Sequence, residues 1–303
     1  MEKNYRILIA YDGSGFADAA LDDLKNAGLP AENAEALIVS VAEVWLPPAG
    51  ESGAEPEFVT AGLRRQYEEN REILAKAKER AERAAARVRT MFPAWTVAAE
   101  ATYGSPAWEI LYRASDYEPD LIVVGAQGRS AFERALLGSI SQKIVTEAKC
   151  SVRVGRGRVE VEDAPARVIL GFDGSAGARE AAAAVLARNW GPATEIKVVI
   201  VADTAFIRNS LDMTTDKFEA EGNRIVEEFA AKGLAASLVV AEGNPKHRLV
   251  EEAENWGADC IFVGAADFAH PFMRHLLGSV SSAVVARAHC SVEVVRPNGY
   301  REQ

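Results

Sequence analysis

The sequence has few cysteines and no excess of positive charge, and each shortage disfavours a class of protein. Its three cysteines, Cys150, Cys260 and Cys290, form no CxxC pair and leave an odd number, which favours free thiols in a reducing compartment. The net charge of −10 disfavours a nucleic-acid partner or an anionic membrane surface, since both attract a basic face. No apolar stretch approaches the roughly 20 residues of a membrane span. The first residues contain no apolar signal core, so we expect a cytoplasmic protein.

The sequence contains an internal repeat. Ile7–Ser14 ends in Tyr-Asp-Gly-Ser and Val168–Ser175 ends in Phe-Asp-Gly-Ser. Each half also carries a later Leu-Leu-Gly-Ser segment and then Cys-Ser-Val. A chain of 303 residues suits two domains of roughly 150 residues each. We therefore expect a first domain over 1–157 and a second over 165–300, joined by a polar linker.

Short apolar runs alternate with helical patterns in both halves. The predicted strands are 6–11, 36–43, 95–101, 121–125 and 151–154, then 167–172, 195–202, 235–241, 260–264 and 291–295. The predicted helices are 15–27, 62–92, 106–117 and 140–148, then 176–188, 214–232, 246–256 and 281–288. Continuous apolar strands separated by helices indicate an α/β fold with a parallel sheet covered on both faces.

Glycines and serines follow the fourth predicted strand of the first half. Gly125 and Gly128 end that strand, and Gly138 and Ser139 open the next helix. Glycines let a ligand approach the backbone, successive amides form an anion-binding nest, and a helix N-terminus favours a phosphate.

Asp12 stands at the end of the first predicted strand. If strands one and four are neighbours, Asp12 and Gly125 flank the crevice in which open α/β sheets bind ligands. A carboxylate there accepts hydrogen bonds from a nucleoside while the glycine loop holds its phosphates. The alternative is that the glycines only make turns and that Asp12 only caps the helix after it.

The chain resembles the universal stress protein family in its tandem two-domain form, over nearly its whole length. That family's nucleotide signature is G-x2-G-x9-G-[S/T], which Gly125, Gly128, Gly138 and Ser139 match. The resemblance implies two doubly wound domains of the adenine nucleotide alpha hydrolase-like fold, each with a five-stranded parallel sheet in the order 3-2-1-4-5. It implies ATP as the ligand, which some members of the family hydrolyse slowly.

The resemblance also implies roles for the other residues of the site. Asp12 and the backbone of Val41 would hold adenosine. The residues that would border the ribose and the phosphates are Tyr11, Gln127, Arg129, Ile140 and Ser141.

The second half departs from this signature. Gly264 is followed by Ala265, Ala266 and Asp267, so a carboxylate stands where the second glycine belongs, and the spacing to Gly278 is one residue longer. A carboxylate repels a triphosphate, more strongly in a desolvated site. We therefore predict that the second domain binds ATP poorly or not at all.

The fifth predicted strand of each half is short and apolar. An exposed apolar edge invites strand pairing, and in the resembling family this strand pairs domains. The two halves are therefore expected to dock as a pseudo-dimer, and an isolated half is expected to dimerise. A homodimer of whole chains stays open.

The leading interpretation is a stress-response protein that binds ATP in its first domain and senses or stores adenine nucleotide. One alternative is a slow ATPase that uses Mg²⁺ or Mn²⁺, and another is a scaffold whose nucleotide is purely structural. We assign no catalytic residue and no metal ligand. No Ser/His/Asp triad can be assembled, and the glycine cradle lacks the lysine of a P-loop, so fast turnover is not expected.

Overall fold

The computed structural model describes residues 4–46, 60–127, 137–157, 165–202, 215–265 and 277–299. The first half of the chain is called repeat 1 below and the second half repeat 2. The strands of repeat 1 are β1 (Tyr5–Ala10), β2 (Ala34–Ala42), β3 (Thr96–Tyr103), β4 (Leu121–Gly125) and β5 (Ser151–Gly155). Its helices are α1 (Gly15–Asp23), α2 (Ala61–Met91), α3 (Pro106–Tyr117) and α4 (Ser139–Glu147), with a short 3₁₀ helix at Leu24–Asn26.

Repeat 2 has the same order of elements. Its strands are β6 (Arg167–Gly171), β7 (Glu195–Ala202), β8 (Ala235–Glu242), β9 (Cys260–Gly264) and β10 (Ser291–Val295). Its described helices are α5 (Ala176–Ala187), α7 (Thr215–Ala231), α8 (Pro245–Trp256) and α9 (Ser279–Arg287).

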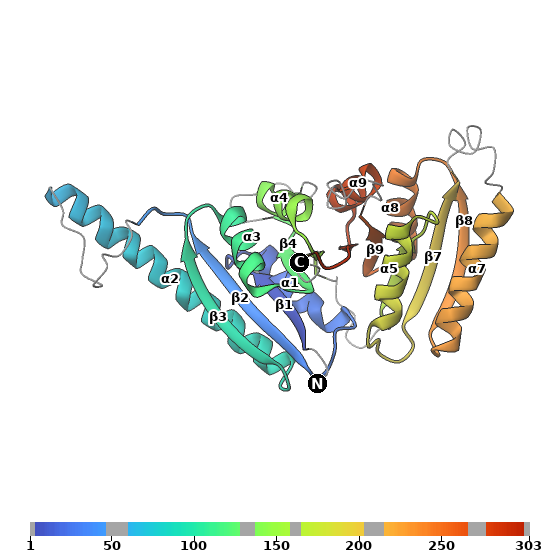
Figure 1. Cartoon of the computed structure of the whole chain (residues 1–303), viewed down its shortest axis with the longest axis horizontal. Helices are drawn as coiled ribbons and strands as arrows, with labels where there is room; N and C mark the ends of the chain where they lie inside the picture. The colour runs from blue at the N-terminus through green and yellow to red at the C-terminus, as the bar shows by residue number, and fades with distance from the viewer. Residues whose placement is uncertain are drawn as a thin grey trace.

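All of these strands belong to one continuous sheet. The order across the described residues is β3-β2-β1-β4-β5-β10-β9-β6-β7-β8 (Figure 1). Each repeat therefore has the order 3-2-1-4-5, and its own strands run parallel. The α/β, doubly wound architecture implied by the resemblance is confirmed.

The two repeats meet at their fifth strands. β5 and β10 pair antiparallel, with Val154 opposite Val292, Arg153 opposite Glu293 and Val152 opposite Val294. The expected pseudo-dimer is thus present, and each fifth strand covers the edge of the other. The outer edges of the sheet are β3 and β8.

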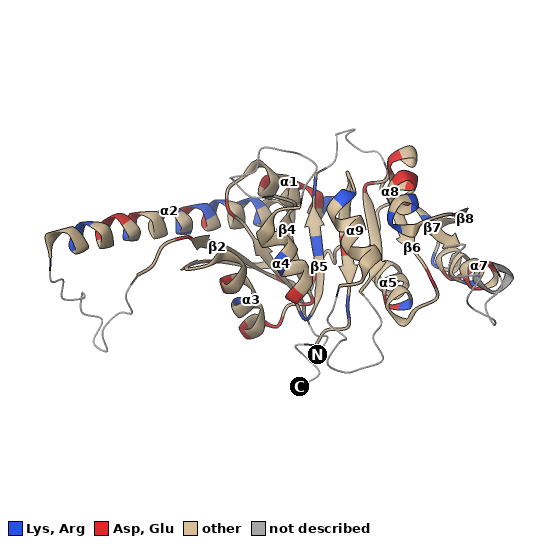
Figure 2. Cartoon of the chain, turned by 90° about the horizontal axis from the view of Figure 1, so that it is seen from above, with Lys and Arg blue, Asp and Glu red and all other residues tan. Residues whose placement is uncertain are grey.

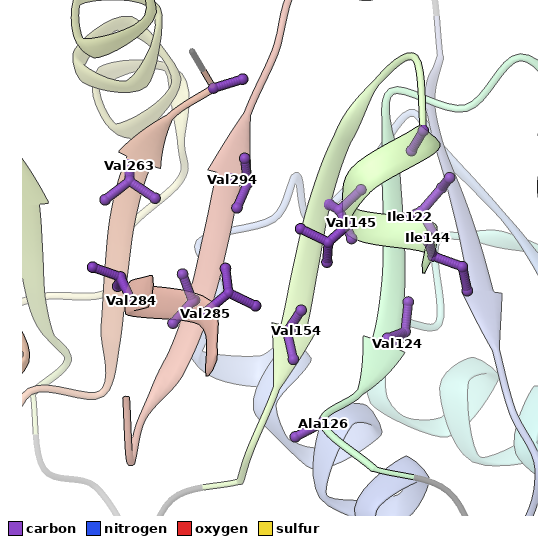
Figure 3. Packing of buried hydrophobic residues seen from close by; sticks show 14 of the residues in the cluster. Ile122, Val124, Ala126, Ile144, Val145, Val154, Val263, Val284, Val285 and Val294 are labelled. Atoms are coloured by element: carbon purple, nitrogen blue, oxygen red, sulfur yellow. The ribbon is translucent and has the colours of Figure 1, made fainter. Parts of the chain in front are cut away.

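The helices form one layer on each face of the sheet. On one face α3, α4, α8 and α9 pack over a cluster of buried residues that runs through both repeats. Figure 3 shows Val145 and Val154 on one side of the boundary between the repeats and Val285 and Val294 on the other. On the opposite face α1 and α2 cover repeat 1, while α5 and α7 cover repeat 2. The apolar face between the repeats is therefore part of the protein core.

Helix α2 is longer than the sheet that it covers. Its buried residues, Ala77, Ala81, Ala84, Ala85 and Val88, all lie in its second half. The first half extends away from the body of the molecule (Figure 1). Acidic and basic residues are interspersed along α2, as Figure 2 shows, which is typical of a solvated helix face.

The predicted element boundaries differ from the observed ones by a residue or two in most places. The largest difference is the helix predicted over 15–27. It consists of α1 followed by a 3₁₀ turn, and Gly28 then adopts a left-handed conformation with φ of 61°. No helix in the described ranges is long and apolar enough to cross a membrane.

Candidate functional site

A crevice lies at the carboxyl ends of β1 and β4. These strands are neighbours in the sheet, with Leu8 opposite Ile122. The chain leaves β1 toward α1 on one face, while α3 and α4 cover the other. The crevice has a cavity volume of about 60 Å³. Its lining comes from β1, β2, β4 and three helices, and includes Ala10, Tyr11, Asp12, Val41, Glu43, Pro106, Ile110, Gly125, Gln127, Ile140, Ser141 and Ile144.

Asp12 takes part in the turn that joins β1 to α1. Its Oδ1 accepts a hydrogen bond from the Ser14 N–H at 2.9 Å, and Gly13 between them has φ of 78°. Ser14 Oγ in turn accepts from the N–H of Ala17 at 3.1 Å and caps α1. The residue that caps the helix is therefore Ser14, while Asp12 shapes the turn and also lines the crevice.

The backbone of Val41 faces the crevice. The carbonyl of Val39 accepts a hydrogen bond from Tyr11 N at 2.9 Å, so the peptide groups of Val39 point toward β1. Successive residues of a strand direct these groups alternately to either side, so Val41 points the same way as Val39. The last residue of β1 is Ala10, which pairs with Val39. The N–H and C=O of Val41 therefore point into the space beyond the end of β1.

Gly125 is required by packing. A Cβ at this position would lie 2.8 Å from the backbone carbonyl carbon and oxygen of Phe16, at the start of α1. Repeat 2 shows the same close approach, since a Cβ at Gly264 would lie 2.2 Å from the carbonyl carbon of Gly177. The first glycine of the signature thus brings α1 close to the end of β4, whether or not a ligand is present. Sequence reasoning did not find this role.

Helix α4 begins at the crevice. Gly138 is its N-cap residue and makes no side-chain cap, so the first amides of the helix have no side-chain acceptor from that position. Ser139 is exposed, and Ile140 lines the cavity. Ser141 is buried and its hydroxyl donates to the Gly125 carbonyl at 2.6 Å. The Ser141 side chain therefore ties α4 to β4, and no side-chain cap from Gly138 competes with an anion for the first amides of α4.

Two other expected residues lie at the crevice with different surroundings. Gln127 is buried and lines it. Tyr11 lines it as well, but its hydroxyl donates to Asp18 Oδ1 at 2.8 Å, and Arg87 donates to the same oxygen. Burial, together with the Asp18 bond, raises the pKa of Tyr11 to about 12. Tyr11 therefore presents its backbone and ring, with its hydroxyl engaged by Asp18.

Three residues to which the sequence analysis gives a role in ATP binding, or in its loss, lie outside the described residues. They are Gly128 and Arg129 of repeat 1 and Asp267 of repeat 2. Their proposed roles stay predictions.

Repeat 2 has a matching crevice between β6 and β9. Asp173 Oδ1 accepts from the Ser175 N–H at 3.0 Å, and Ser281 Oγ donates to the Gly264 carbonyl at 2.7 Å. The cavity volume is about 330 Å³, larger than in repeat 1. Gly171 and Val280 line it where repeat 1 has Ala10 and Ile140. Smaller side chains account for part of the extra room.

The apolar wall of the repeat 1 crevice was missed by sequence reasoning. It includes Pro106 and Ile110 of α3 and Ile144 of α4. Both helices were predicted, but nothing in the spacing of their residues showed which side chains would reach the crevice. The described residues contain no group of three or more histidine, cysteine or acidic side chains placed to hold a metal ion.

Comparison with known proteins agrees with this fold. The universal stress protein family model matches residues 3–156 and again 166–296. The chain therefore belongs to the universal stress protein family, with two copies of the family domain in tandem.

Relatives match either nearly the whole chain or about half of it. A universal stress protein of Mycobacterium tuberculosis is 28% identical over 97% of this chain and 98% of its own length. A universal stress protein of Thermus aquaticus is 35% identical and covers 50% of this chain and 97% of its own length. Among solved structures, a universal stress protein from Archaeoglobus fulgidus has a TM-score of 0.67 at 21% identity, covering 98% of this chain and 99% of its own. That likeness supports the fold.

Proposed function

We propose that repeat 1 binds adenine nucleotide, ATP in the first instance, and that the chain acts as a nucleotide-binding stress-response protein of the cytoplasm. One observation carries this proposal. The carboxylate of Asp12, the peptide groups of Val41 and the N-terminal turn of α4 converge on a single crevice.

Each of these groups suits one part of a nucleotide. The Asp12 carboxylate accepts hydrogen bonds from ribose hydroxyls. The Val41 N–H and C=O offer a donor and an acceptor side by side to the edge of adenine, against an apolar wall that includes Ile110. The amides at the start of α4 and the helix dipole favour phosphate oxygens. The cavity of about 60 Å³ is smaller than the roughly 300 Å³ at which ligand pockets begin, so binding requires the lining side chains to move.

The same proposal has consequences for the metal ion and for repeat 2. Mg²⁺ or Mn²⁺ would accompany the triphosphate, and we assign it no protein ligand. Repeat 2 would bind ATP poorly because of Asp267, and the domain boundaries at 1–157 and 165–300 separate the two sites.

The experiment that tests the proposal uses a matched pair of variants, S139D and S279D. Both serines are exposed first residues of equivalent helices, α4 and α9. An aspartate at a helix N-terminus does not oppose the helix dipole, so both variants should fold. Isothermal titration of the full chain with Mg·ATP should show a single site that S139D weakens at least tenfold and S279D leaves unchanged. Weakening by S279D alone would move the site to repeat 2, and weakening by neither would contradict binding at these helix ends.

Hydrolysis is a separate question from binding. The rival function, a slow metal-dependent ATPase, predicts single-turnover release of ADP with Mg²⁺ or Mn²⁺ that is lost in S139D. The third candidate, a scaffold with a structural nucleotide, predicts a higher melting temperature with ATP and no change in assembly.

A further inference from the structure

The interface at which β5 pairs with β10 is called the seam. It contains a row of four buried charged side chains. Asp23 of α1 forms a two-pronged ion pair with Arg153 of β5, at 2.6 Å from Arg153 Nε to Asp23 Oδ2 and 3.2 Å from Nη2 to Oδ1. Arg153 Nη1 also donates to Glu293 Oε2 of β10 at 3.1 Å. Glu293 accepts a further bond from Arg188, which follows α5. The side chain of Arg153 is fully buried, and none of the other three is more than 6% exposed.

The charges in this row alternate in sign from repeat 1 to repeat 2. They read negative at Asp23, positive at Arg153, negative at Glu293 and positive at Arg188. Burial alone would lower the pKa of Arg153, but Asp23 and Glu293 hold it well above its ordinary value. The guanidinium is therefore charged at neutral pH.

Other contacts across the seam occur in pairs related by a pseudo-two-fold axis. The Arg156 N–H donates to Ser291 Oγ at 3.0 Å, and the Arg296 N–H donates to Ser151 Oγ at 3.2 Å. The guanidinium of Arg156 reaches the carbonyl of Val285, and that of Arg296 reaches the carbonyl of Val145. Ser151 and Ser291 both follow the Cys that begins the Cys-Ser-Val segment, so these contacts join equivalent positions of the two repeats. Such contacts would form equally well between two copies of one repeat.

Arg153 and Glu293 break this symmetry at its axis. They occupy equivalent positions in the repeats and lie directly opposite each other in the ladder. A pseudo-two-fold axis therefore passes between them, and in a pair of identical repeats the residue at this position would face its own copy. Two copies of repeat 1 would place Arg153 against Arg153, and two copies of repeat 2 would place Glu293 against Glu293. Each such pair of identical repeats lacks the ion pair between Arg153 and Glu293 and places like charges together in a buried environment.

We propose that the charge row Asp23–Arg153–Glu293–Arg188 determines partner choice at this seam, so that each repeat accepts the other repeat and rejects a second copy of itself. Buried ion pairs contribute little net stability compared with apolar packing, and their best-supported use is to specify register and partner. The inference reverses the expectation that an isolated repeat dimerises through its fifth strand. It also concerns the seam alone and does not depend on nucleotide binding.

The test uses full chains in which the charges of one repeat at a time are reversed. D23R/R153E and R188E/E293R each keep the ion pair within a repeat but bring like charges together across the seam. We expect each to lower the melting temperature by at least about 5 °C, corresponding to a loss of about 1–3 kcal/mol. The chain with all four substitutions restores alternation and should recover at least half of the summed loss. R65E/E69R, which reverses an exposed ion pair of α2, is the control and should change nothing.

Mixing gives a second readout. In an equimolar mixture of the two half-reversed chains, repeat 1 of each matches repeat 2 of the other. Native mass spectrometry should therefore show a complex of one chain of each kind, which neither chain forms with itself. The proposal is overturned if the two half reversals have additive effects in the four-fold variant, or if the mixture contains as much same-chain as mixed-chain dimer. If the half-reversed chains do not fold, recovery of folding in the four-fold variant supports the proposal and its absence overturns it.

Discussion

The crevices of repeat 1 and repeat 2 are built from the same elements, but their cavities measure about 60 and 330 Å³. In both, an aspartate side chain accepts a hydrogen bond from the backbone N–H of the serine two residues later. In both, a serine hydroxyl also bonds a helix to the end of a strand. These shared contacts belong to the fold. The lining residues that differ include Ala10 and Ile140 of repeat 1, whose counterparts in repeat 2 are the smaller Gly171 and Val280. Cavity size thus favours repeat 2 and the glycine signature favours repeat 1, and ligand-binding measurements on the two repeats distinguish them.

The largest expected effect concerns the glycines that both crevices share. G125A and G264A each place a Cβ within 3 Å of the backbone of the facing helix, and the approach is closer in repeat 2. Overpacking of this kind costs about 1–3 kcal/mol, so both variants should unfold at lower urea concentration, G264A at the lowest. G15A is the control, since a Cβ there meets nothing within 4 Å. Equal stability of all three variants would contradict the packing role.

The second prediction separates the repeats by ligand. In D12N and D173N the side-chain carbonyl still accepts the turn bond from Ser14 or Ser175, but the charge is lost. Hydrogen bonds to charged groups contribute about 1.5–3 kcal/mol. We therefore expect D12N to weaken ATP binding about 10- to 150-fold in a calorimetric titration and D173N to leave it unchanged. The reverse pattern would assign the nucleotide to the roomier crevice of repeat 2.

The third prediction concerns a contact that the repeats have in common. S141A and S281A each remove one hydroxyl-to-carbonyl hydrogen bond, at 2.6 and 2.7 Å. Each should lower the free energy of unfolding by about 1 kcal/mol, measured by urea titration. A loss of ATP affinity in S141A much beyond this amount would show that the hydroxyl also contacts the ligand.

The smallest effect is the alkaline behaviour of Tyr11, whose equivalent position in repeat 2 is occupied by Phe172. Burial and then the Asp18 hydrogen bond raise the pKa of Tyr11 from 10.0 to about 12. The folded protein holds this proton more tightly than the unfolded chain. The stabilisation is therefore complete below about pH 10 and is lost as the pH rises from about 10 to 12.

Replacing Tyr11 by phenylalanine tests that sign. Y11F should be somewhat less stable at neutral pH, since a hydrogen bond is lost, and should lose less stability than the native chain above pH 10. The comparison is made between the two chains because Tyr5, whose pKa is also raised to about 12, titrates in both. Parallel stability curves for the two proteins between pH 9 and 11.5 would contradict the assignment.

Most of the fold could be predicted from the sequence because its periodicity is strong. The apolar runs at Leu121–Gly125 and Cys260–Gly264 each lie between two predicted helices. They form β4 and β9 with the predicted bounds. The pairing of the fifth strands followed from the family resemblance. The charge row could not be predicted, because Asp23 and Arg153 are far apart in the sequence and each reads as an ordinary charged residue until the seam brings them together.

The candidate site was predictable only in part. Asp12, Val41, Gly125, Ile140 and Ser141 all lie at one crevice. The sequence did not reveal that Gly125 allows α1 to approach β4 or that Ser141 bonds the Gly125 carbonyl, because both depend on the distance between a helix and a strand end. Periodicity predicts which face of an element is buried, while such distances arise only from packing.

The central claim is that adenine nucleotide occupies the crevice of repeat 1. The most direct measurement is a crystal structure of the full chain grown with a non-hydrolysable ATP analogue and Mg²⁺. We predict adenosine between Asp12 and Val41, with phosphates at the start of α4, and no nucleotide beside Asp173. Nucleotide bound beside Asp173 with the repeat 1 crevice empty would contradict the account.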